Sequence, residues 1–253
     1  MPLSRNILVL VCCLGTLWGC AQQPETETEE SADLTEEVSE ILPDQPADPA
    51  IVTAAPTMAR TVFANEWVAV ARVDLPPGEL IPPHDAGVRY ALPLSDFTLS
   101  VIDNGVKEIV HMVPGEIATW PAGRLSFSNV DDSEGEFLMI ERDAVETSPE
   151  LETLAIPDVA VDMERHGTVL LDDDNVLVVD TRLDQLMEDP LPPNLPLLVV
   201  ALSDCDLEFE GAAVSDVENV MKAGEAAWLP AGYNLVSNVG ETEAYAVVFG
   251  FRK

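Results

Sequence analysis

The side chains best suited to chemistry in this sequence are its three histidines, His84, His111 and His166. An imidazole can ligate a transition metal or transfer protons near neutral pH. A mononuclear metal site needs three or four nitrogen or carboxylate ligands that converge on one point. Because the three histidines are scattered along the chain, such a site would need acidic residues to complete it.

Other catalytic patterns are absent from the sequence. It contains no Gly-x-Ser-x-Gly nucleophile elbow, no phosphate-binding loop and no His-Glu-x-x-His pair. Two acidic clusters, at 131–136 and 172–175, carry oxygen atoms that suit Ca²⁺, but their spacing matches no known calcium loop. We interpret both clusters as solvated turns.

The charge balance limits the partners of this protein. Asp and Glu number 46 against 12 Lys and Arg, which gives a formal net charge of -34. Such a chain repels phosphate backbones, so nucleic acid is excluded as a partner. The acidic balance is typical of a soluble, self-repelling surface. Adaptation to a salty medium and weak Ca²⁺ binding are the alternatives.

Residues 1–19 have the features of a lipoprotein signal peptide. Arg5 supplies a positive charge, and Ile7–Trp18 is apolar but too short for a permanent membrane span. The Leu-Trp-Gly-Cys that ends at Cys20 resembles the lipobox of bacterial lipoproteins, which implies cleavage before this cysteine and an anchor in the lipid bilayer through the acylated Cys20. Because Ala21 follows, the chain resembles lipoproteins of an outer membrane that face the periplasm or the cell surface. A plain secretory signal and an uncleaved anchor are the alternatives.

The four cysteines are assigned on this basis. Cys12 and Cys13 are removed with the signal, Cys20 receives lipid, and Cys205 has no partner, so we expect no disulfide. Cys205 alternates in phase with the apolar residues of its strand, which predicts a core position rather than a reactive thiol.

The segment 20–57 is expected to be a disordered acidic tether. It holds ten acidic residues from Glu25 to Asp48 and no Lys or Arg, and Pro24, Pro43, Pro46 and Pro49 are interleaved with or flank these acids. Such a stretch cannot bury enough apolar surface to offset its ordering entropy, and like charges extend it. We predict a spacer between the membrane and the folded part.

One pattern occurs twice and organises the rest of the chain. It reads Gly-Glu-x-Ala-x-x-Pro-Ala-Gly, followed after four residues by Ser-Asn-Val, and its two copies begin at Gly115 and Gly224. Such a repeat marks duplication of a whole domain. The glycines and prolines predict a strand, a tight turn and a second strand. The turn residues of the two copies are Gly115, Pro121, Gly123 and Asn129, and Gly224, Pro230, Gly232 and Asn238.

The Gly-x5-Pro-x-Gly spacing in both copies resembles the second motif of the cupin superfamily. This resemblance implies an all-β fold of two antiparallel jelly-roll barrels, a bicupin, with barrel 1 at 58–145, a linker at 146–167 and barrel 2 at 168–253. The family's motif continues to a metal-binding histidine, which neither copy has. Leu125-Ser126 and Leu235-Val236 stand near its place.

The first motif of the family is also degenerate. Five residues separate Gly78 from His84, as in the motif, but Ala86 replaces the second histidine, and 87–90 lacks the expected Glu. In the second half a proline-rich segment, 187–194, occupies the equivalent place and is a poor strand. The resemblance therefore implies barrels without metal or other cofactor. We predict that Asn129 and Asn238 hydrogen-bond turn backbone rather than a metal.

Three side chains remain candidates for a ligand cavity in barrel 1, namely His84, Arg89 and Tyr90. Arg89 and Tyr90 are neighbours on one expected strand, so one of them faces away from the cavity. We interpret His111 as an outward strand residue and His166 as a linker residue.

Apolar alternation predicts the remaining strands. They are expected at 67–73, 90–94, 97–101, 106–113 and 136–142 in the first half, at 175–183, 197–204 and 205–209 in the second half, and at 158–162 in the linker. In this alignment Arg182 of the second half matches Arg72 of the first.

Three functions fit this sequence. The first is a non-catalytic envelope lipoprotein whose metal-free barrels bind a small polar ligand or an envelope protein. The second is a cupin enzyme with an atypical metal site, or a metal-free one of the epimerase or isomerase type. The third is a structural role at the cell surface.

Overall fold

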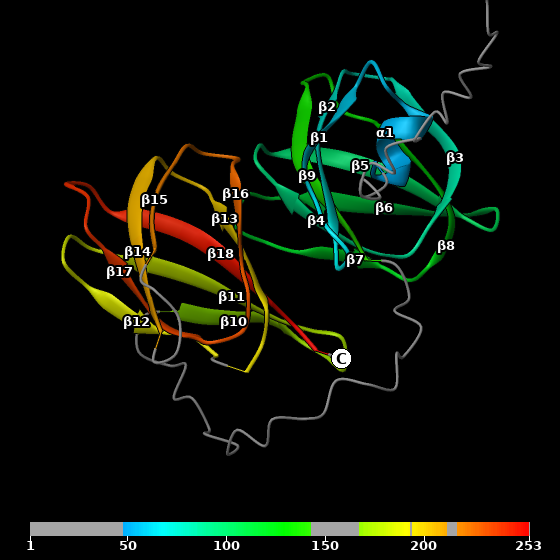
Figure 1. The fold of residues 1–253 in the computed structure, drawn as a ribbon. Coiled ribbons are helices and arrows are strands. Elements are labelled where there is room, and N and C mark those ends of the chain that lie inside the picture. Colours follow the sequence, from blue (N-terminus) through cyan, green and yellow to red (C-terminus); the bar gives the residue numbers. More distant parts are fainter. Residues whose placement is uncertain (1–47, 143–166, 193, 212–216, 253) are drawn as a thin grey trace, which may run out of the picture. The chain divides into compact units, whose positions relative to one another are not determined.

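The structure is a computed structural model that describes residues 48–142, 167–192, 194–211 and 217–252 (Figure 1). All of the described residues belong to one compact unit, Asp44–Lys253. The described part is built almost entirely from antiparallel strands, with one short helix, α1 (Ala50–Ala54). Within it, no helix has the length and apolar character needed to cross a membrane. The strand predicted at 158–162 lies outside the described residues.

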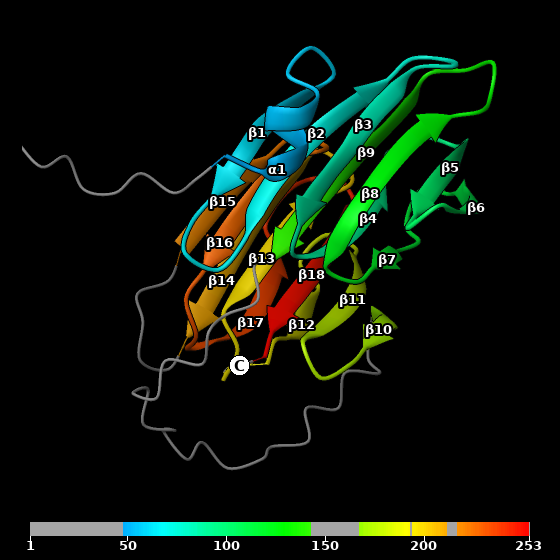
Figure 2. The same ribbon diagram turned by 90° about the vertical axis from the view of Figure 1, so that its right-hand side faces the viewer.

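Barrel 1 consists of two sheets, with strand orders β1-β2-β9-β4-β7 and β3-β8-β5-β6 (Figure 2). Its strands are β1 (Ala59–Ala64), β2 (Ala69–Leu75), β3 (Leu80–Ala86), β4 (Val88–Pro93), β5 (Phe97–Asp103), β6 (Val106–Met112), β7 (Ala118–Trp120), β8 (Gly123–Asn129) and β9 (Gly135–Arg142). Two antiparallel sheets in this order form a jelly roll.

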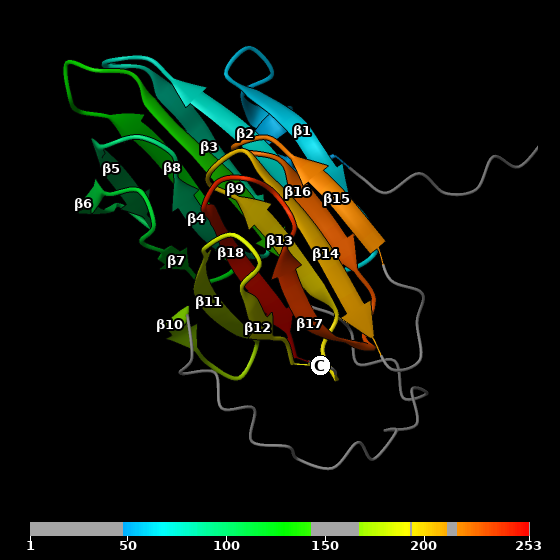
Figure 3. The ribbon, with the colours of Figure 1, turned by 90° about the vertical axis from the view of Figure 1, so that its left-hand side faces the viewer.

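Barrel 2 repeats this arrangement strand for strand, with orders β10-β11-β18-β13-β16 and β12-β17-β14-β15 (Figure 3). Its strands are β10 (Gly167–Asp172), β11 (Val176–Leu183), β12 (Glu188–Pro190), β13 (Leu197–Ala201), β14 (Cys205–Gly211), β15 (Val217–Met221), β16 (Ala226–Leu229), β17 (Tyr233–Asn238) and β18 (Ala244–Phe251). The two-barrel antiparallel fold expected from the sequence is confirmed.

Each barrel has its own apolar core. In barrel 1 the aromatic rings of Phe97 and Phe137 stack with their centroids 5.7 Å apart. Apolar residues of both sheets fill the space between the sheets. In barrel 2, Cys205 is buried among Leu207, Phe209 and their neighbours, as its phase in the sequence predicts. Burial raises the pKa of the Cys205 thiol to about 11, so it stays protonated at neutral pH.

A third apolar cluster joins the outer faces of the two five-stranded sheets. The Tyr90 ring of β4 meets the Phe249 ring of β18 edge to face at 6.2 Å, and Phe63 stacks on Trp228 at 6.1 Å. Because these strands are covered on both faces, they read as nearly continuous apolar runs in the sequence. The two barrels therefore bury a shared interface.

The predicted end of the tether at residue 57 is wrong. Residues 48–57 were assigned to the spacer, but α1 lies there and Ile51 is fully buried in the core of barrel 1. The cause is the apolar Ala-Ile-Val sequence that follows Pro49. Burial of the Ile51 side chain stabilises the packing of this helical turn against barrel 1. Barrel 1 thus begins before residue 58.

Two predicted details in barrel 2 are wrong. The proline-rich segment does contain a strand, β12, which pairs with β17 at the edge of its sheet, where prolines are tolerated. The match of Arg182 to Arg72 is shifted by two residues. The carbonyl oxygens of Leu75 and Leu183 accept equivalent hydrogen bonds from Asn129 and Asn238, so Leu75 and Leu183 occupy the same position in the two barrels. Arg72, three residues before Leu75, therefore aligns with Asp180. A shift of two keeps the same face, so alternation alone did not reveal it.

The repeated turns have a structural reason for their glycines. Gly115 and Gly224 have φ of 86° and 82°, a region that favours glycine. A Cβ on Gly115 would lie 2.2 Å from Oη of Tyr245, and one on Gly224 would lie 2.6 Å from Nη1 of Arg72. Each glycine thus makes room for a side chain of the other barrel. The turns at Gly123 and Gly232, after Pro121 and Pro230, also have positive φ, of 151° and 125°.

Candidate ligand site

His84 lies on β3 and is buried, with 8% of its surface exposed. Its Nδ1 is 2.9 Å from the carbonyl oxygen of Pro82, so Nδ1 carries the proton and donates it. The Nε2 atom is buried and has no hydrogen-bond partner among the described residues. Burial, which outweighs the hydrogen bond to Pro82, lowers the pKa of His84 from 6.5. His84 therefore offers a free acceptor, Nε2, at neutral pH.

Arg89 is fully buried on β4. Its Nη2 donates to the carbonyl oxygens of His84, at 3.1 Å, and Gly123, at 2.9 Å. Its Nε and Nη1 have no partner within the described part of the chain. A buried guanidinium with two unmatched donors is costly unless an acceptor is supplied. Arg89 and His84 together thus present three unpaired nitrogen atoms.

Tyr90 does not belong to this site. As the next residue on β4, it points away from Arg89 and packs in the interface between the barrels. Burial raises its pKa to about 12. As predicted, one of Arg89 and Tyr90 faces away from the interior of barrel 1, and that residue is Tyr90. Tyr90 is therefore not a cavity residue.

Glu141 is a buried acid that the sequence analysis did not identify. It pairs with Arg89 in the register of β4 and β9. Its carboxylate accepts hydrogen bonds from the backbone nitrogens of Ala50, at 2.6 Å, and Ile51, at 3.1 Å. Glu141 therefore fixes α1 against barrel 1. In the sequence, the one sign of this residue is that an acid directly follows the apolar run of β9.

A hollow of about 350 Å³ lies between α1 and β3 and reaches His84. Its walls are Ala50, Thr53 and Ala54 on the helix side and Pro82, Pro83, His84 and Asp85 on the strand side. A smaller hollow of about 250 Å³ opens beside it, next to Glu141 and Trp67. Only the first of these hollows borders His84.

The residues of barrel 1 do not fit a transition metal. His84 is the one imidazole of the first motif, Leu125 pairs opposite it on β8 as a core residue, and Ala86 has no ligand atom. Among the described residues, no three His, Cys, Asp or Glu side chains gather closely enough to hold a metal ion. That statement also covers the acidic turns at 131–136 and 172–175.

The other histidines are not placed in a site. His111 is exposed on β6, with Nδ1 3.5 Å from the Thr98 hydroxyl. His166 lies outside the described residues.

Barrel 2 has a buried acid, Asp189 of β12. Asp189 lies opposite Val236 in the strand register, the position that Ile81 takes opposite Phe127 in barrel 1. The prolines around Asp189 predict a loop, so the sequence pattern does not mark this acid as buried.

The lowered pKa of His84 gives a pH prediction. Between that pKa and 6.5 the unfolded chain binds a proton at His84 that the folded protein excludes, so stability should rise with pH through this window. We expect His84→Gln to weaken the dependence of the melting temperature on pH below 6.5. The exposed His111→Gln serves as the control and should preserve the wild-type slope. A wild-type slope in His84→Gln would contradict the prediction.

Comparisons with known proteins agree with this architecture. The chain matches no protein-family model, and no curated protein matches its sequence. Among solved structures, a variant oxalate decarboxylase from Bacillus subtilis aligns with a TM-score of 0.58 at 12% identity, over 77% of this chain and 72% of that chain. A cupin 2 conserved barrel domain protein from Leptotrichia buccalis aligns with a TM-score of 0.46 at 15% identity, over 77% and 88%.

At this identity the likeness to oxalate decarboxylase concerns the fold. Together with the duplicated strand order, it shows that this chain has the two-barrel cupin fold, that of a bicupin. This was expected from the resemblance of its repeated turns. The likeness does not extend to the residues that could bind a ligand or metal in each barrel, which are described here from this chain alone.

Proposed function

We propose that this chain is a membrane-anchored, metal-free bicupin lipoprotein of the cell envelope that binds a small polar ligand without transforming it. The observation that carries the proposal is the pair His84 and Arg89 inside barrel 1, with three unpaired nitrogen atoms and no gathered metal ligands in the described residues. A guanidinium and a neutral imidazole suit a small hydroxy acid or other weakly acidic molecule.

The ligand chemistry follows from the free atoms. Nε and Nη1 of Arg89 donate hydrogen bonds, so the ligand must present an anionic or carbonyl oxygen to them. Nε2 of His84 accepts, so the ligand must also present a hydroxyl or amine hydrogen. Asp85 lines the entrance, where its carboxylate is paired with Arg124 at 3.0 Å. A small monoanion with one donor carries both kinds of group.

The envelope assignment rests on the lipobox-like sequence that ends at Cys20 and on the acidic spacer that follows. An acylated cysteine would hold the two barrels at the surface of a membrane, and the spacer would set their distance from it. Binding rather than catalysis also fits the absence of a recognisable nucleophile and base pair in the sequence.

Metal analysis tests this proposal against an enzyme with an atypical metal site. We expect purified mature protein to contain far less than one equivalent of Fe, Mn, Ni, Cu or Zn, because two imidazoles and one carboxylate do not converge in barrel 1. His84→Ala should leave the metal content unchanged, and His111→Ala serves as its matched control. Near-stoichiometric metal that is lost in His84→Ala but kept in His111→Ala would favour the enzyme.

A further inference from the structure

The outer face of the four-stranded sheet of barrel 1 carries apolar side chains that lie outside its core. Leu99 and Val101 of β5 and Phe127 of β8 point into the core, so the residues between them point outward. Residues that lie opposite each other in the register share a face, which extends this set to β3 and β6. The outward residues, which we call the Ile109 face, are Leu80, Thr98, Ser100, Ile102, Lys107, Ile109, His111, Ser126 and Ser128.

Three large side chains of the Ile109 face are open to solvent. Leu80 is 51% exposed, Ile102 40% and Ile109 55%. Ile102 and Ile109 are diagonal neighbours across β5 and β6. One row crosses all four strands and consists of Leu80, Ser128, Ser100 and Ile109. Because the serines are short, raised apolar positions alternate with low ones on this face.

The duplicated barrel shows what the same positions hold on a solvated face. Counted from the equivalent Asn129 and Asn238, the matching row of barrel 2 consists of Glu188, Ser237, Glu208 and Glu218. In the neighbouring rows Glu210 takes the place of Ile102, and Asp206 takes that of Thr98. The face of barrel 2 thus holds acids at the positions where the Ile109 face holds apolar residues and small hydroxyl residues.

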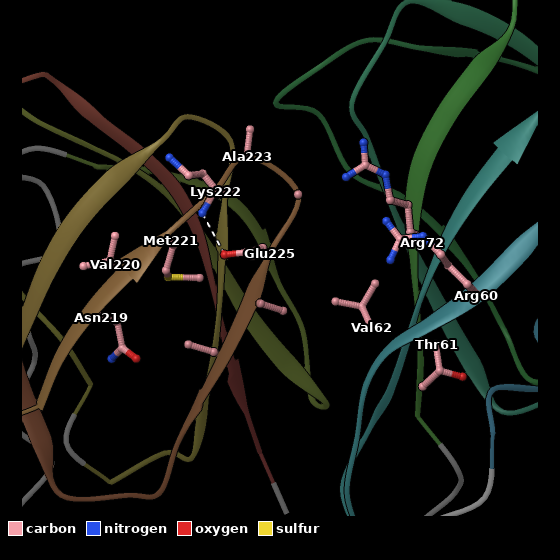
Figure 4. Close-up of a pocket in the computed structure, with 13 residues that line it drawn as sticks. Arg60, Thr61, Val62, Arg72, Asn219, Val220, Met221, Lys222, Ala223 and Glu225 are labelled. Carbon is pink, nitrogen blue, oxygen red and sulfur yellow. Dashed lines mark hydrogen bonds between the residues drawn. The ribbon is translucent and has the colours of Figure 1, made fainter.

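The hollow at the edge of the barrel interface does not show this kind of contrast (Figure 4). On one wall Arg72 forms an ion pair with Glu136. On the other wall Nζ of Lys222 lies 2.9 Å from Asp204. These cations are accompanied by acids, so charge does not mark this hollow as a contact site.

The Ile109 face is nearly without charge in a chain whose formal net charge is -34. Lys107 is its one charged residue, and none of its residues is an acid. At the end of the face, Asp85 of β3 and Arg124 of β8 neutralise each other at 3.0 Å. Copies of so acidic a chain repel each other, and a face without acids removes that repulsion locally.

We propose that the Ile109 face packs against the same face of a second copy of this chain, related to it by a two-fold axis. The raised Ile102 and Ile109 of one copy fill the low positions at Ser100 and Ser128 of the other copy. The two sheets then lie about 10 Å apart, the spacing of sheets that pack face to face. A two-fold contact of this kind closes on itself and gives a dimer.

Two other occupants fit the face less well. A surface of anionic lipids attracts each nearby cation by about 1 kcal/mol, and the face has only Lys107 to offer. Packing against the matching face of barrel 2 would set Glu208 and Glu210 against Ile102 and Ile109 and bury their charge without partners.

Sedimentation equilibrium of the full mature chain tests the dimer, with Cys20→Ala to remove the expected lipid anchor. We expect a monomer–dimer equilibrium with a Kd of about 100 μM or tighter, as for a small interface. Because salt screens the repulsion between two acidic copies, a higher ionic strength should strengthen the dimer.

Ile109→Glu introduces the residue type that barrel 2 has at the same register position, Glu218. It should weaken the dimer about tenfold or more, because the contact would strip water from the new carboxylate. Val220→Glu is the matched control, since Val220 is 69% exposed on β15 of barrel 2 and lies outside the Ile109 face. Both variants should melt close to the wild-type temperature, because both side chains are exposed.

The proposal is overturned if the chain stays monomeric up to about 1 mM at high salt, if Ile109→Glu dimerises as the wild type does, or if Val220→Glu loses as much affinity. A dimer that salt weakens would depend on ion pairs, and species larger than a dimer would reveal a heterologous contact. Either of these results also contradicts a two-fold contact through the Ile109 face.

Discussion

Replacing Cys20 by Ala transfers the protein from the membrane fraction to the soluble fraction, which is the largest change that we expect from any single substitution. The thiol of Cys20 is the expected attachment point of the diacylglycerol, and the new amine of the same residue takes a further acyl chain. Each buried CH2 contributes about 0.8 kcal/mol, so several chains hold the protein firmly and their loss removes the anchor.

Ultracentrifugation of cell lysates, combined with labelling by a radioactive fatty acid, measures this effect. Cys205→Ala is the matched control, because Cys205 is buried in the core of barrel 2 and should keep both the label and the membrane association. If the Cys20→Ala protein pelleted with membranes as tightly as the wild type, the lipoprotein assignment would be wrong.

The fold was predictable because its signals are local. Alternation over a few residues marks a strand, and the two copies of the turn at Gly115 and Gly224 show that the pattern is duplicated. The role of Asn129 and Asn238 was also predictable from the sequence. In the structure each side-chain amide hydrogen-bonds the backbone of its own turn, as expected. These features need no knowledge of distant contacts.

The candidate site was only partly predictable because its contacts are distant in sequence. Alternation showed that Arg89 and Tyr90 face opposite ways, but the choice between them depends on barrel 2, whose Phe249 covers Tyr90. Glu141 holds Ile51 across 90 residues of chain, a contact that no local pattern encodes.

The same limit applies to the contact between Arg72 of barrel 1 and the turn at Gly224 of barrel 2. Arg60 and Arg72 face each other only because β1 and β2 pair in a register that is interrupted by an irregularity after Thr61. Neither the register nor the approach of Gly224 from barrel 2 to Arg72 can be read from spacing. Sequence patterns thus predict which residues share a strand face, and the register decides which of them meet.

The second large effect concerns the buried amides of the repeated turns. Asn238 is fully buried, and its Nδ2 donates to the carbonyl oxygens of Leu183 and Thr242, both at 2.8 Å. Its Oδ1 accepts from the backbone nitrogen of Gly240 at 3.0 Å. Asn238→Ala leaves three backbone groups without partners, each of which costs about 1–3 kcal/mol when buried. We expect a loss of about 3 kcal/mol in the free energy of unfolding.

Asn129→Ala should have a similar effect in barrel 1. Its Nδ2 donates to Leu75 and Ser133, at 2.9 and 2.7 Å, and its Oδ1 accepts from the backbone nitrogen of Asp131. Urea unfolding followed by circular dichroism and by tryptophan fluorescence measures both losses. Asn104→Gly is the control, since Asn104 is exposed at a φ of 47°, which glycine adopts readily, and should change stability by less than about 0.5 kcal/mol.

The two substitutions also test whether the barrels unfold together. The interface cluster buries side chains of both barrels, including Tyr90, Leu138, Phe249 and Phe251. If one barrel unfolded alone, it would expose the apolar half of this interface that belongs to the other barrel. We therefore expect either amide substitution to shift a single transition rather than to split it, with both probes reporting the same midpoint. Two separate transitions would mean that the interface contributes too little to couple the barrels, and an unchanged midpoint in both variants would contradict the role assigned to the amides.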